Sequence, residues 1–394
     1  MITNQKEPIV IEGGCSYCGD AAINHTLAYW SSLFFDPFEE HMVRTAYHSP
    51  KFLKNFVDWL AIFFLNLLAF FGIVKFSSDL GRAKSFRSRV IWEEARRRGI
   101  QMEQVIIFGK PIDYYRALIG GKYIYFESLP IPPEHLDFRR NWDDKSILKD
   151  ELARHSVPTQ KYKMVRGNLE QLWHGLEKPL IVKPKLGSRG RHTFTGINML
   201  EDFKNAVKIS GEISPYLVAE EHIAGDVCRA TFVSGKLAGF YRGRAPSVTG
   251  DGKKNIAELI KEKDRIRPER VEKVRRGKEL ESHLARQGYG LDDVLSEGKM
   301  VTLSHRIGRL FGGTTREMIG ELHPSFIPIF RRAAEITGLA VVGFDAVIPD
   351  PTASADSQRW GIIEANTLPF IDLHYYALEG KPRNIAGMIW NLWK

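Results

Sequence analysis

Cysteine is scarce in this chain, with Cys15, Cys18 and Cys228 the three in a length of 394 residues. Three cysteines cannot form a disulfide framework, which excludes the small disulfide-stabilised class of secreted proteins. The first 30 residues also lack a basic segment followed by an apolar run, so they do not resemble a secretory signal peptide. We therefore expect a reducing, cytoplasmic setting for the bulk of the chain.

Two common glycine-rich phosphate-binding motifs are also absent. No G-x-x-x-x-G-K-[ST] run occurs, and no G-x-G-x-x-G run follows an expected strand. This excludes a P-loop nucleotide site and a Rossmann dinucleotide site. The 34 glycines and 19 prolines are ordinary for a globular chain, and the length predicts two to three domains of about 150 residues each.

Acidic residues are in deficit over most of the chain. The 56 Lys and Arg against 47 Asp and Glu give +9, and residues 1–80 hold 5 basic and 8 acidic side chains, or −3, so residues 81–394 carry +12. The densest basic stretch, residues 259–279, has acids interleaved with its bases. We expect a solvated helical face there and no nucleic-acid partner, because interleaved acids weaken a phosphate track.

One long apolar run is present. Ten of the 23 phenylalanines lie between Phe34 and Phe76, and residues 56–74 contain only Asp58 and Asn66 as strongly polar side chains. Such a run nearly spans a bilayer, and the excess of Lys and Arg after it would leave the C-terminal bulk in the cytoplasm. Two interpretations stay open: a membrane-associated helix, or a helix buried in the core or in an oligomer interface.

The spacing of apolar and turn residues predicts the order of the elements. Residues 85–99 and 143–155 read as helices, and residues 102–109 and 122–128 read as short strands. We expect three regions: residues 1–80, hydrophobic and aromatic with the apolar helix at 56–74; residues 81–140, a small α/β domain; and residues 141–394, the main domain.

The C-x-x-C formed by Cys15 and Cys18 has three interpretations. It is consistent with a redox-active pair, or with half of a zinc site completed by His25 or His41. Because no second C-x-x-C occurs, a turn with two reduced thiols is the simplest expectation.

A glycine-rich basic loop follows an expected strand in the run from Lys178 to Phe194. The strand delivers Lys183, and the loop places Gly187 and Gly190 among basic side chains. Glycine lets backbone N–H groups approach phosphate oxygens closely, while the bases offset the phosphate charge. The run is typical of a nucleotide cradle or of a plain surface turn.

Oxygen ligands gather on two expected strands near the C-terminus. Asp345 lies in the run 341–348, and Glu364 and Asn366 lie in the run 360–369. Alternate residues of a strand point to one face, so Glu364 and Asn366 can share a cation with Asp345 from a neighbouring strand. Oxygen ligands of this kind suit Mg²⁺.

Over residues 141–394 the chain carries an ordered series of runs: Asp144-Lys145 at a helix start, IVKP with its glycine-rich loop, LVAEEHIAGDVCR, RAPSVTGDGKKNIAELI, GGTTRE, GFDAV and IIEANTLP. This series resembles the ATP-grasp superfamily, and within it the cyanophycin-synthetase-like and glutathione-synthetase-like carboxylate–amine ligases. The resemblance implies an α+β (α/β) ATP-grasp fold in which two α+β subdomains clasp ATP, preceded by a small α/β domain and the hydrophobic N-terminal helical segment.

The resemblance also implies roles for single residues. Lys145 and Lys183 match two nucleotide lysines, with Lys183 on the α and β phosphates. Arg229 matches a catalytic arginine that reaches the γ-phosphate or the acyl phosphate. The other matches are Lys185, Gly187, Ser188 and Gly190 in the loop over the β and γ phosphates, Glu220 and Glu221 at the adenine hinge, and Asp345, Glu364 and Asn366 as ligands of one or two Mg²⁺ ions, with Mn²⁺ as a substitute.

One position departs from the pattern. Relatives commonly carry G-x-D-x-R after the hinge, whereas here Asp226 directly follows Gly225. A shift of one residue in a strand turns the side chain to the other face, so no ribose contact is assigned and the substrate is not carried over.

The activity implied is ATP-dependent ligation of a small carboxylate to an amine, with amino acids or peptides as substrates. It proceeds through an acyl phosphate and releases ADP and phosphate. Two alternatives stay open: an ATP-grasp kinase that stops at phosphoryl transfer, and a membrane-tethered nucleotide-binding module without turnover.

Overall fold

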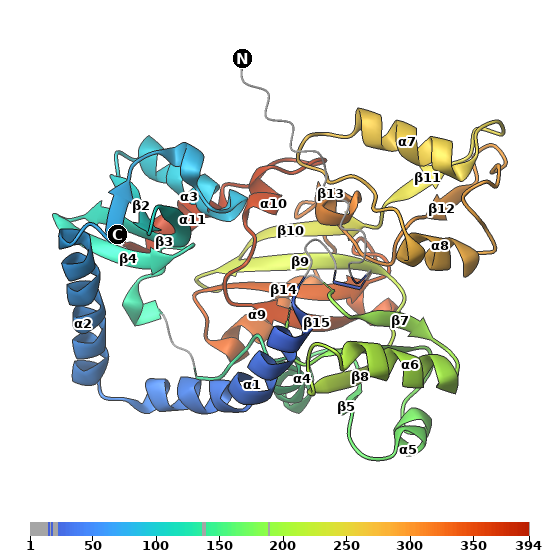
Figure 1. Cartoon of the computed structure of the whole chain (residues 1–394), viewed down its shortest axis with the longest axis horizontal. Coiled ribbons are helices and arrows are strands. Elements are labelled where there is room, and N and C mark those ends of the chain that lie inside the picture. The colour runs from blue at the N-terminus through green and yellow to red at the C-terminus, as the bar shows by residue number, and fades with distance from the viewer. Residues whose placement is uncertain (1–14, 16, 19–22, 136–138, 188–189, 394) are drawn as a thin grey trace. The chain divides into compact units, whose positions relative to one another are not determined.

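The computed structural model describes residues 15, 17–18, 23–135, 139–187 and 190–393 (Figure 1). The chain divides into two compact units, and each unit draws on segments that lie far apart in the sequence. Unit 1 comprises residues 1–33, 163–220 and 245–313, and unit 2 comprises residues 34–162, 221–244 and 314–394. The domain boundaries expected from the sequence remain a prediction.

Unit 1 contains a four-stranded sheet with two helices. In order across the sheet, the strands are β5 (Tyr162–Met164), β8 (Leu217–Glu221), β6 (Leu180–Pro184) and β7 (Phe194–Ile197), and the helices are α5 (Leu169–His174) and α6 (Leu200–Ser210). Phe203 and Ala206 of α6 are buried in one core with Leu180 and Val182 of β6. This packing holds β6, which carries Lys183 near its C-terminal end.

A second part of unit 1 pairs two short strands beside two helices. The elements are β11 (Ser247–Thr249), β12 (Met300–Thr302), α7 (Ile256–Ile266) and α8 (Lys278–Ala285). α7 begins with a reciprocal capping box between Asn255 and Glu258. It ends at Ile266 because Arg267 precedes Pro268 and is extended. The helical face expected over 259–279 is therefore wrong beyond residue 266, since residues 267–277 form no helix.

Unit 2 is built around a five-stranded antiparallel sheet. In order, the strands are β13 (Thr314–Glu317), β10 (Lys236–Arg244), β9 (Asp226–Val233), β14 (Val341–Ile348) and β15 (Gly361–Asn366). The helices α4 (Lys145–Arg154) and α9 (Phe326–Thr337) pack on it over a core that includes Phe232, Phe240 and Phe344 (Figure 1). The helix expected over 143–155 and the strands expected over 341–348 and 360–369 are confirmed.

A smaller antiparallel sheet completes unit 2. Its strands, in order, are β1 (Val74–Ser77), β2 (Met102–Ile107), β3 (Lys110–Ile119) and β4 (Lys122–Glu127), and the helices beside it are α3 (Phe86–Arg97), α10 (Asp372–Tyr375) and α11 (Ile385–Trp390). Trp92, Tyr115 and Trp390 are buried in their common core. The helix expected over 85–99 and the strands expected over 102–109 and 122–128 are confirmed, whereas β3 had not been predicted.

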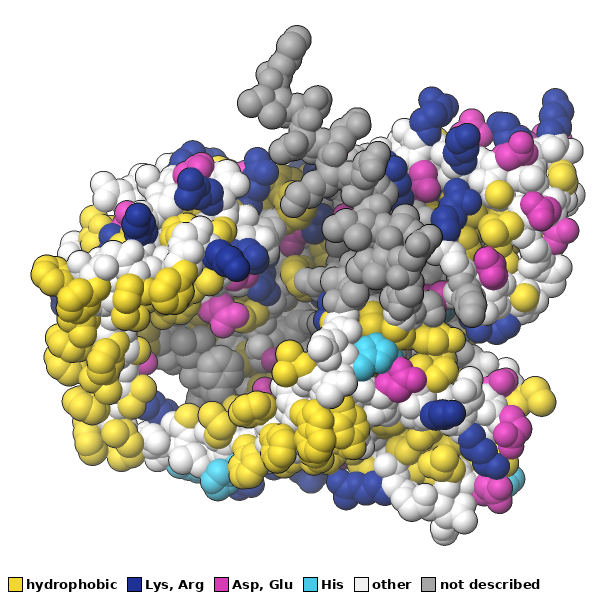
Figure 2. All heavy atoms as spheres, in the orientation of Figure 1, with side chains coloured by type: hydrophobic (Ala, Val, Ile, Leu, Met, Phe, Trp, Pro, Cys, Tyr) yellow, Lys and Arg dark blue, Asp and Glu magenta, His cyan; other side chains and the backbone are white. Residues whose placement is uncertain are grey.

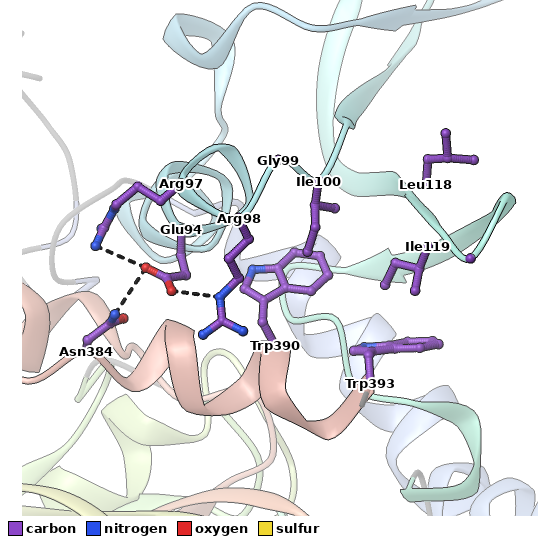
Figure 3. A pocket seen from close by; sticks show the side chains of 11 residues that line it. Glu94, Arg97, Arg98, Gly99, Ile100, Leu118, Ile119, Asn384, Trp390 and Trp393 are labelled. Carbon is purple, nitrogen blue, oxygen red and sulfur yellow. Dashed lines mark hydrogen bonds and ion pairs between the residues drawn. The ribbon is translucent and has the colours of Figure 1, made fainter.

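Figure 3 shows a pocket of about 690 Å³ where α3, the β3–β4 hairpin and α11 meet. Glu94 of α3 lies at one side of it and accepts from Arg98 at 2.8 Å and from Asn384 at 3.1 Å, and it pairs with Arg97 at 3.0 Å. This cluster ties the C-terminal helix to α3. None of the residues that the sequence singled out for chemistry lines the pocket.

The phenylalanine-rich run forms α1 (His25–His48) and α2 (Lys51–Phe70). In the described part of the chain, Phe52–Phe70 is the single helical stretch long and apolar enough to cross a membrane, by length and composition only, and none of its apolar window is buried. Phe52 and Phe70 are 74% and 84% exposed, and Figure 2 shows apolar side chains gathered over α2. The interpretation of a core helix is therefore wrong for the single chain.

Candidate functional site

Three neighbouring strands of unit 2 bring the expected metal and phosphate residues together. Asp345 on β14 lies directly opposite Arg229 on β9 and opposite Glu364 on β15. Asn366 follows two residues after Glu364 and pairs with Gly343 of β14. β14 and β15 are therefore neighbours, as expected from the sequence. The pairing of β9 with β14 also places Arg229 beside Asp345.

Arg229 and Asp345 form a bidentate ion pair inside the sheet. The Arg229 Nε and Nη2 atoms each donate to one oxygen of the Asp345 carboxylate at 2.6 Å. Both side chains are buried. Burial raises the pKa of Asp345, but the charge and hydrogen bonds of Arg229 outweigh that effect and hold the pKa below its ordinary value of 3.8. Asp345 is therefore ionised at neutral pH.

Arg229 keeps one donor that this pair does not use. Its Nη1 atom is buried and has no hydrogen-bond partner among the described residues. The Tyr241 ring, opposite Arg229 in the pairing of β9 with β10, lies 5.8 Å from the guanidinium carbon. A buried donor without a partner is unfavourable, so Nη1 fits an anionic ligand. Tyr241 had not been predicted, because strand pairing places it here and no sequence motif marks it.

Glu364 and Asn366 present oxygens beside the ion pair. The Glu364 side chain is 27% exposed, and its Oε2 atom lies 4.0 Å from Nζ of Lys145, the first residue of α4. The Asn366 amide nitrogen lies 3.5 Å from Asp345 Oδ2 and donates to the Gly343 carbonyl at 3.3 Å. Two carboxylates and one amide thus form an all-oxygen donor set at the edge of a buried pair. These residues fit a partly hydrated Mg²⁺ ion.

Gly343 gives the Arg229 side chain room to cross β14. A Cβ atom at this position would lie 2.8 Å from Pro369 Cβ and 3.3 Å from Arg229 Cδ. We expect Gly343→Ala to lower the free energy of unfolding by about 1–3 kcal/mol, because proline and the arginine stem must both shift. Gly320→Ala is the control, since a Cβ atom there meets nothing within 4 Å. Equal stability of both variants in urea would contradict this packing.

In unit 1, Lys183 of β6 pairs with Glu220 of β8. The Lys183 Nζ atom donates to Glu220 Oε1 at 2.5 Å, and both side chains are buried. The structure thus joins a residue expected at the phosphates to one expected at the adenine hinge. The next residue, Glu221, belongs to unit 2 and pairs there with Arg359 at 2.6 Å, because successive strand residues point to opposite faces.

The glycine-rich loop connects β6 to β7. Gly187 and Gly190 take φ values of +118° and +61°, a region of backbone space that favours glycine. The Lys185 amide donates to the Tyr216 carbonyl at 2.8 Å, which holds the start of the loop beside the sheet. Ser188, which the sequence assigned to this loop, lies outside the described residues.

Asp226, one position early against the family pattern, turns towards β10. Its Oδ2 atom accepts from Arg242 Nε at 2.5 Å. The carboxylate thus has a partner within the sheet, and the structure offers no argument for assigning it to ribose.

No protein-family model matches the chain. The cyanophycin synthetase of Trichormus variabilis (strain ATCC 29413 / PCC 7937) is 29% identical over 259 residues, covering 63% of this chain and 29% of that protein. The glutathione biosynthesis bifunctional protein GshAB of Listeria monocytogenes serotype 4b (strain F2365) is 24% identical over 321 residues, covering 77% and 40%. The chain spans less than half the length of these two relatives.

A solved structure shares the fold. The bifunctional glutathione synthetase from Pasteurella multocida superposes with a TM-score of 0.54 at 20% identity, covering 78% of this chain and 43% of that one. Residues 141–394 are 254 of the 394, or about 64%, so this likeness reaches into residues before 141. The fold and the sequence relatives agree: the chain has the ATP-grasp fold and is similar to a cyanophycin synthetase and to bifunctional proteins of glutathione synthesis.

Proposed function

We propose that the chain is an ATP-dependent ligase that joins a carboxylate to an amine. One observation carries the proposal: Arg229 and Asp345 form a buried bidentate pair with a buried spare donor, and Glu364 and Asn366 lie on the neighbouring strand. A buried ion pair adds little net stability over apolar side chains of similar volume, which favours a role in chemistry. The relatives named above are synthetases.

In the proposed reaction a carboxylate oxygen attacks the γ-phosphorus of ATP, the bond to the β–γ bridging oxygen breaks, and an acyl phosphate and ADP form. An amine nitrogen then attacks the acyl carbon, loses a proton to solvent and expels inorganic phosphate. Arg229 would donate from Nη1 to the transferring phosphoryl group, and Lys183 would hold the α and β phosphates. One or two Mg²⁺ ions bound by Asp345, Glu364 and Asn366 would supply further positive charge.

Amino acids or short peptides are the substrates we propose for both halves of the reaction. The net charge of +12 over residues 81–394 favours small anionic ligands. Acids interleaved with the bases of residues 259–279 argue against a nucleic-acid partner.

Pooled substrates test the ligase against its two alternatives. The full chain is incubated with ATP, Mg²⁺, pooled amino acids and hydroxylamine, and the products are identified by mass spectrometry. ADP together with a hydroxamate indicates an acyl phosphate, whereas ADP with a stable phosphorylated product indicates a kinase. Absence of ADP indicates a module without turnover. Asp345→Asn is the control, because a contaminating ATPase would be unaffected by it.

We further propose that α2 attaches the chain to a membrane, with the C-terminal bulk in the cytoplasm. The support is a 19-residue apolar stretch whose phenylalanines and tryptophan are exposed, flanked by more basic residues after it than before it. The alternative occupant of this surface is α2 of a second copy.

Fractionation without detergent separates these outcomes. We expect the full chain in the membrane pellet, and we expect Phe52→Ser, Phe56→Ser and Phe63→Ser together to release it. Substitution within α2 leaves β1 intact, which begins at Val74 and pairs with β2. A supernatant monomer would contradict attachment, and a supernatant dimer that the triple variant dissociates would assign α2 to an interface between copies.

A further inference from the structure

Four side chains that commonly bind metals meet in unit 1. Cys15 and Cys18 come from the N-terminal segment, His25 begins α1, and His192 lies just before β7. One ligand atom from each lies within 4.8 Å of all the others. The Cys18 sulfur is 3.1 Å from His25 Nε2 and 3.6 Å from His192 Nε2, and the Cys15 sulfur is also 3.6 Å from His192 Nε2.

The two 3.6 Å separations match a tetrahedral zinc site, and the separation of the Cys18 sulfur from His25 Nε2, 3.1 Å, is shorter by 0.5 Å. Zinc–sulfur bonds of about 2.3 Å and zinc–nitrogen bonds of about 2.0–2.1 Å, at tetrahedral angles, separate sulfur from nitrogen by roughly 3.6 Å. Two thiolates and two imidazoles form a Cys₂His₂ donor set, which is typical of structural zinc. Four protein ligands leave no open position, which favours a structural role over a catalytic one.

The second nitrogen of each imidazole is held by an acceptor. His192 Nδ1 lies 2.8 Å from the Ile209 carbonyl oxygen, and His25 Nδ1 lies 3.1 Å from Glu212 Oε2. A carbonyl oxygen and a carboxylate can only accept, so both Nδ1 atoms carry the proton. In a neutral ring Nε2 then keeps its lone pair, and both Nε2 atoms face the sulfurs. Metal-bound histidines characteristically show this arrangement.

Two separate thiol–imidazole hydrogen bonds would not require all four groups to converge. Here the Cys18 sulfur reaches both Nε2 atoms, and Cys18 and His192 are only 2% and 0% exposed. A disulfide is not formed either, since both cysteines are free. Convergence of two sulfurs and two imidazole nitrogens, with Cys18 and His192 buried, is explained by a shared cation.

We propose that Cys15, Cys18, His25 and His192 bind one zinc ion, which fastens the N-terminal segment to the end of the glycine-rich loop. Binding would displace the two thiol protons and neutralise the two thiolates. Two other contacts join the same two segments. The His192 amide donates to the Tyr17 carbonyl at 3.0 Å, and the Tyr17 and Phe194 ring centroids are 4.9 Å apart.

From the sequence, His25 or His41 was the candidate to complete a zinc site with the C-x-x-C. The structure brings in His25 and not His41, and it adds His192, which lies 174 residues after Cys18. Because His192 follows Gly190 by two residues, the ion would fix the C-terminal end of the loop. A role of this loop in binding ATP rests on the proposed function, whereas the metal site itself does not.

Metal content tests the site directly. The full chain is produced with added zinc, purified in a reducing buffer and analysed by elemental mass spectrometry. We expect about one zinc per chain in the wild type and almost none in the Cys15→Ser/Cys18→Ser double variant. Cys228→Ala and His41→Ala are matched controls and should keep the metal, since neither residue belongs to the cluster.

Two further measurements test the zinc site even if the Cys15→Ser/Cys18→Ser double variant fails to fold. Glu212→Ala should weaken zinc binding about 10- to 100-fold in competition with a chelator, because Glu212 orients the His25 ring and is not one of the four proposed ligands. Wild-type chain stripped of metal should bind Co²⁺ with the intense visible bands of a four-coordinate site. Less than about one-tenth equivalent of zinc in the wild type, unchanged zinc in the double variant, or a Cys15–Cys18 disulfide would overturn the proposal. No ATP is present, so failure here is distinguishable from failure of the ligase.

Discussion

Lys183→Ala is expected to lower ADP formation by about 100- to 1,000-fold. The reason is the loss of a fixed positive charge where the proposed reaction needs phosphate binding. The substitution should also lower stability, because Lys183 forms an ion pair with Glu220, which is fully buried. Removing one partner of a buried ion pair lowers stability by about 3–5 kcal/mol.

The Lys183→Met/Glu220→Gln double variant separates the two effects. Replacing both charges with neutral groups of similar volume removes the buried carboxylate together with its cation, so stability should return close to the wild-type value. ADP formation should stay as low as in Lys183→Ala. Urea denaturation and an ADP assay on the same preparations measure both. If activity recovers together with stability, Lys183 is structural and the phosphate role is wrong.

Arg229→Met should produce the second large effect, in unit 2. The variant loses both hydrogen bonds to Asp345 and the spare Nη1 donor, so we expect ADP formation to fall by about 100- to 1,000-fold. It also leaves Asp345 buried without its cation, and stability should fall by about 3–5 kcal/mol. The Arg229→Met/Asp345→Asn double variant should recover most of that stability and none of the activity. Activity in the double variant would contradict the assignment.

The same pair predicts a pH dependence of stability. Because the folded-state pKa of Asp345 lies below the ordinary 3.8, the ionised carboxylate stabilises the fold at every pH above about 4. That contribution disappears as the pH falls through the lowered folded-state value. Between pH 4 and pH 2, the wild type should therefore lose stability more steeply than the Arg229→Met/Asp345→Asn variant. Equal slopes for the two proteins would contradict a depressed pKa.

Local patterns predicted the strands that carry the chemistry. Asp345, Glu364 and Asn366 lie in β-branched, apolar runs that are short enough to be strands, and both runs form strands as expected. Alternation within a strand was enough to place Glu364 and Asn366 on one face. The partner strand β9 was not predictable, because its pairing with β14 spans more than 100 residues and depends on the whole sheet.

Other contacts could not be predicted from sequence patterns. The Lys183–Glu220 pair depends on β6 and β8 lying side by side, and nothing in either run specifies that neighbour. His192 stands in a basic loop with no spacing to another ligand, so the C-x-x-C gave no reason to choose it. β3 was missed because Lys110–Ile119 mixes charged residues with aromatic ones and contains Pro111, which together obscure the strand period.

The central claim is that a carboxylate is activated by transfer of the γ-phosphoryl group of ATP, and isotope transfer tests it most directly. The full chain is supplied with ATP, Mg²⁺, unlabelled amines and a pool of amino acids and short peptides whose carboxylates carry ¹⁸O. If an acyl phosphate forms and an amine displaces it, one ¹⁸O atom passes from the carboxylate to the released phosphate, which mass spectrometry detects. We expect singly labelled phosphate in step with ADP, and none from Lys183→Met/Glu220→Gln. Unlabelled phosphate, or AMP and pyrophosphate in place of ADP, would contradict the account.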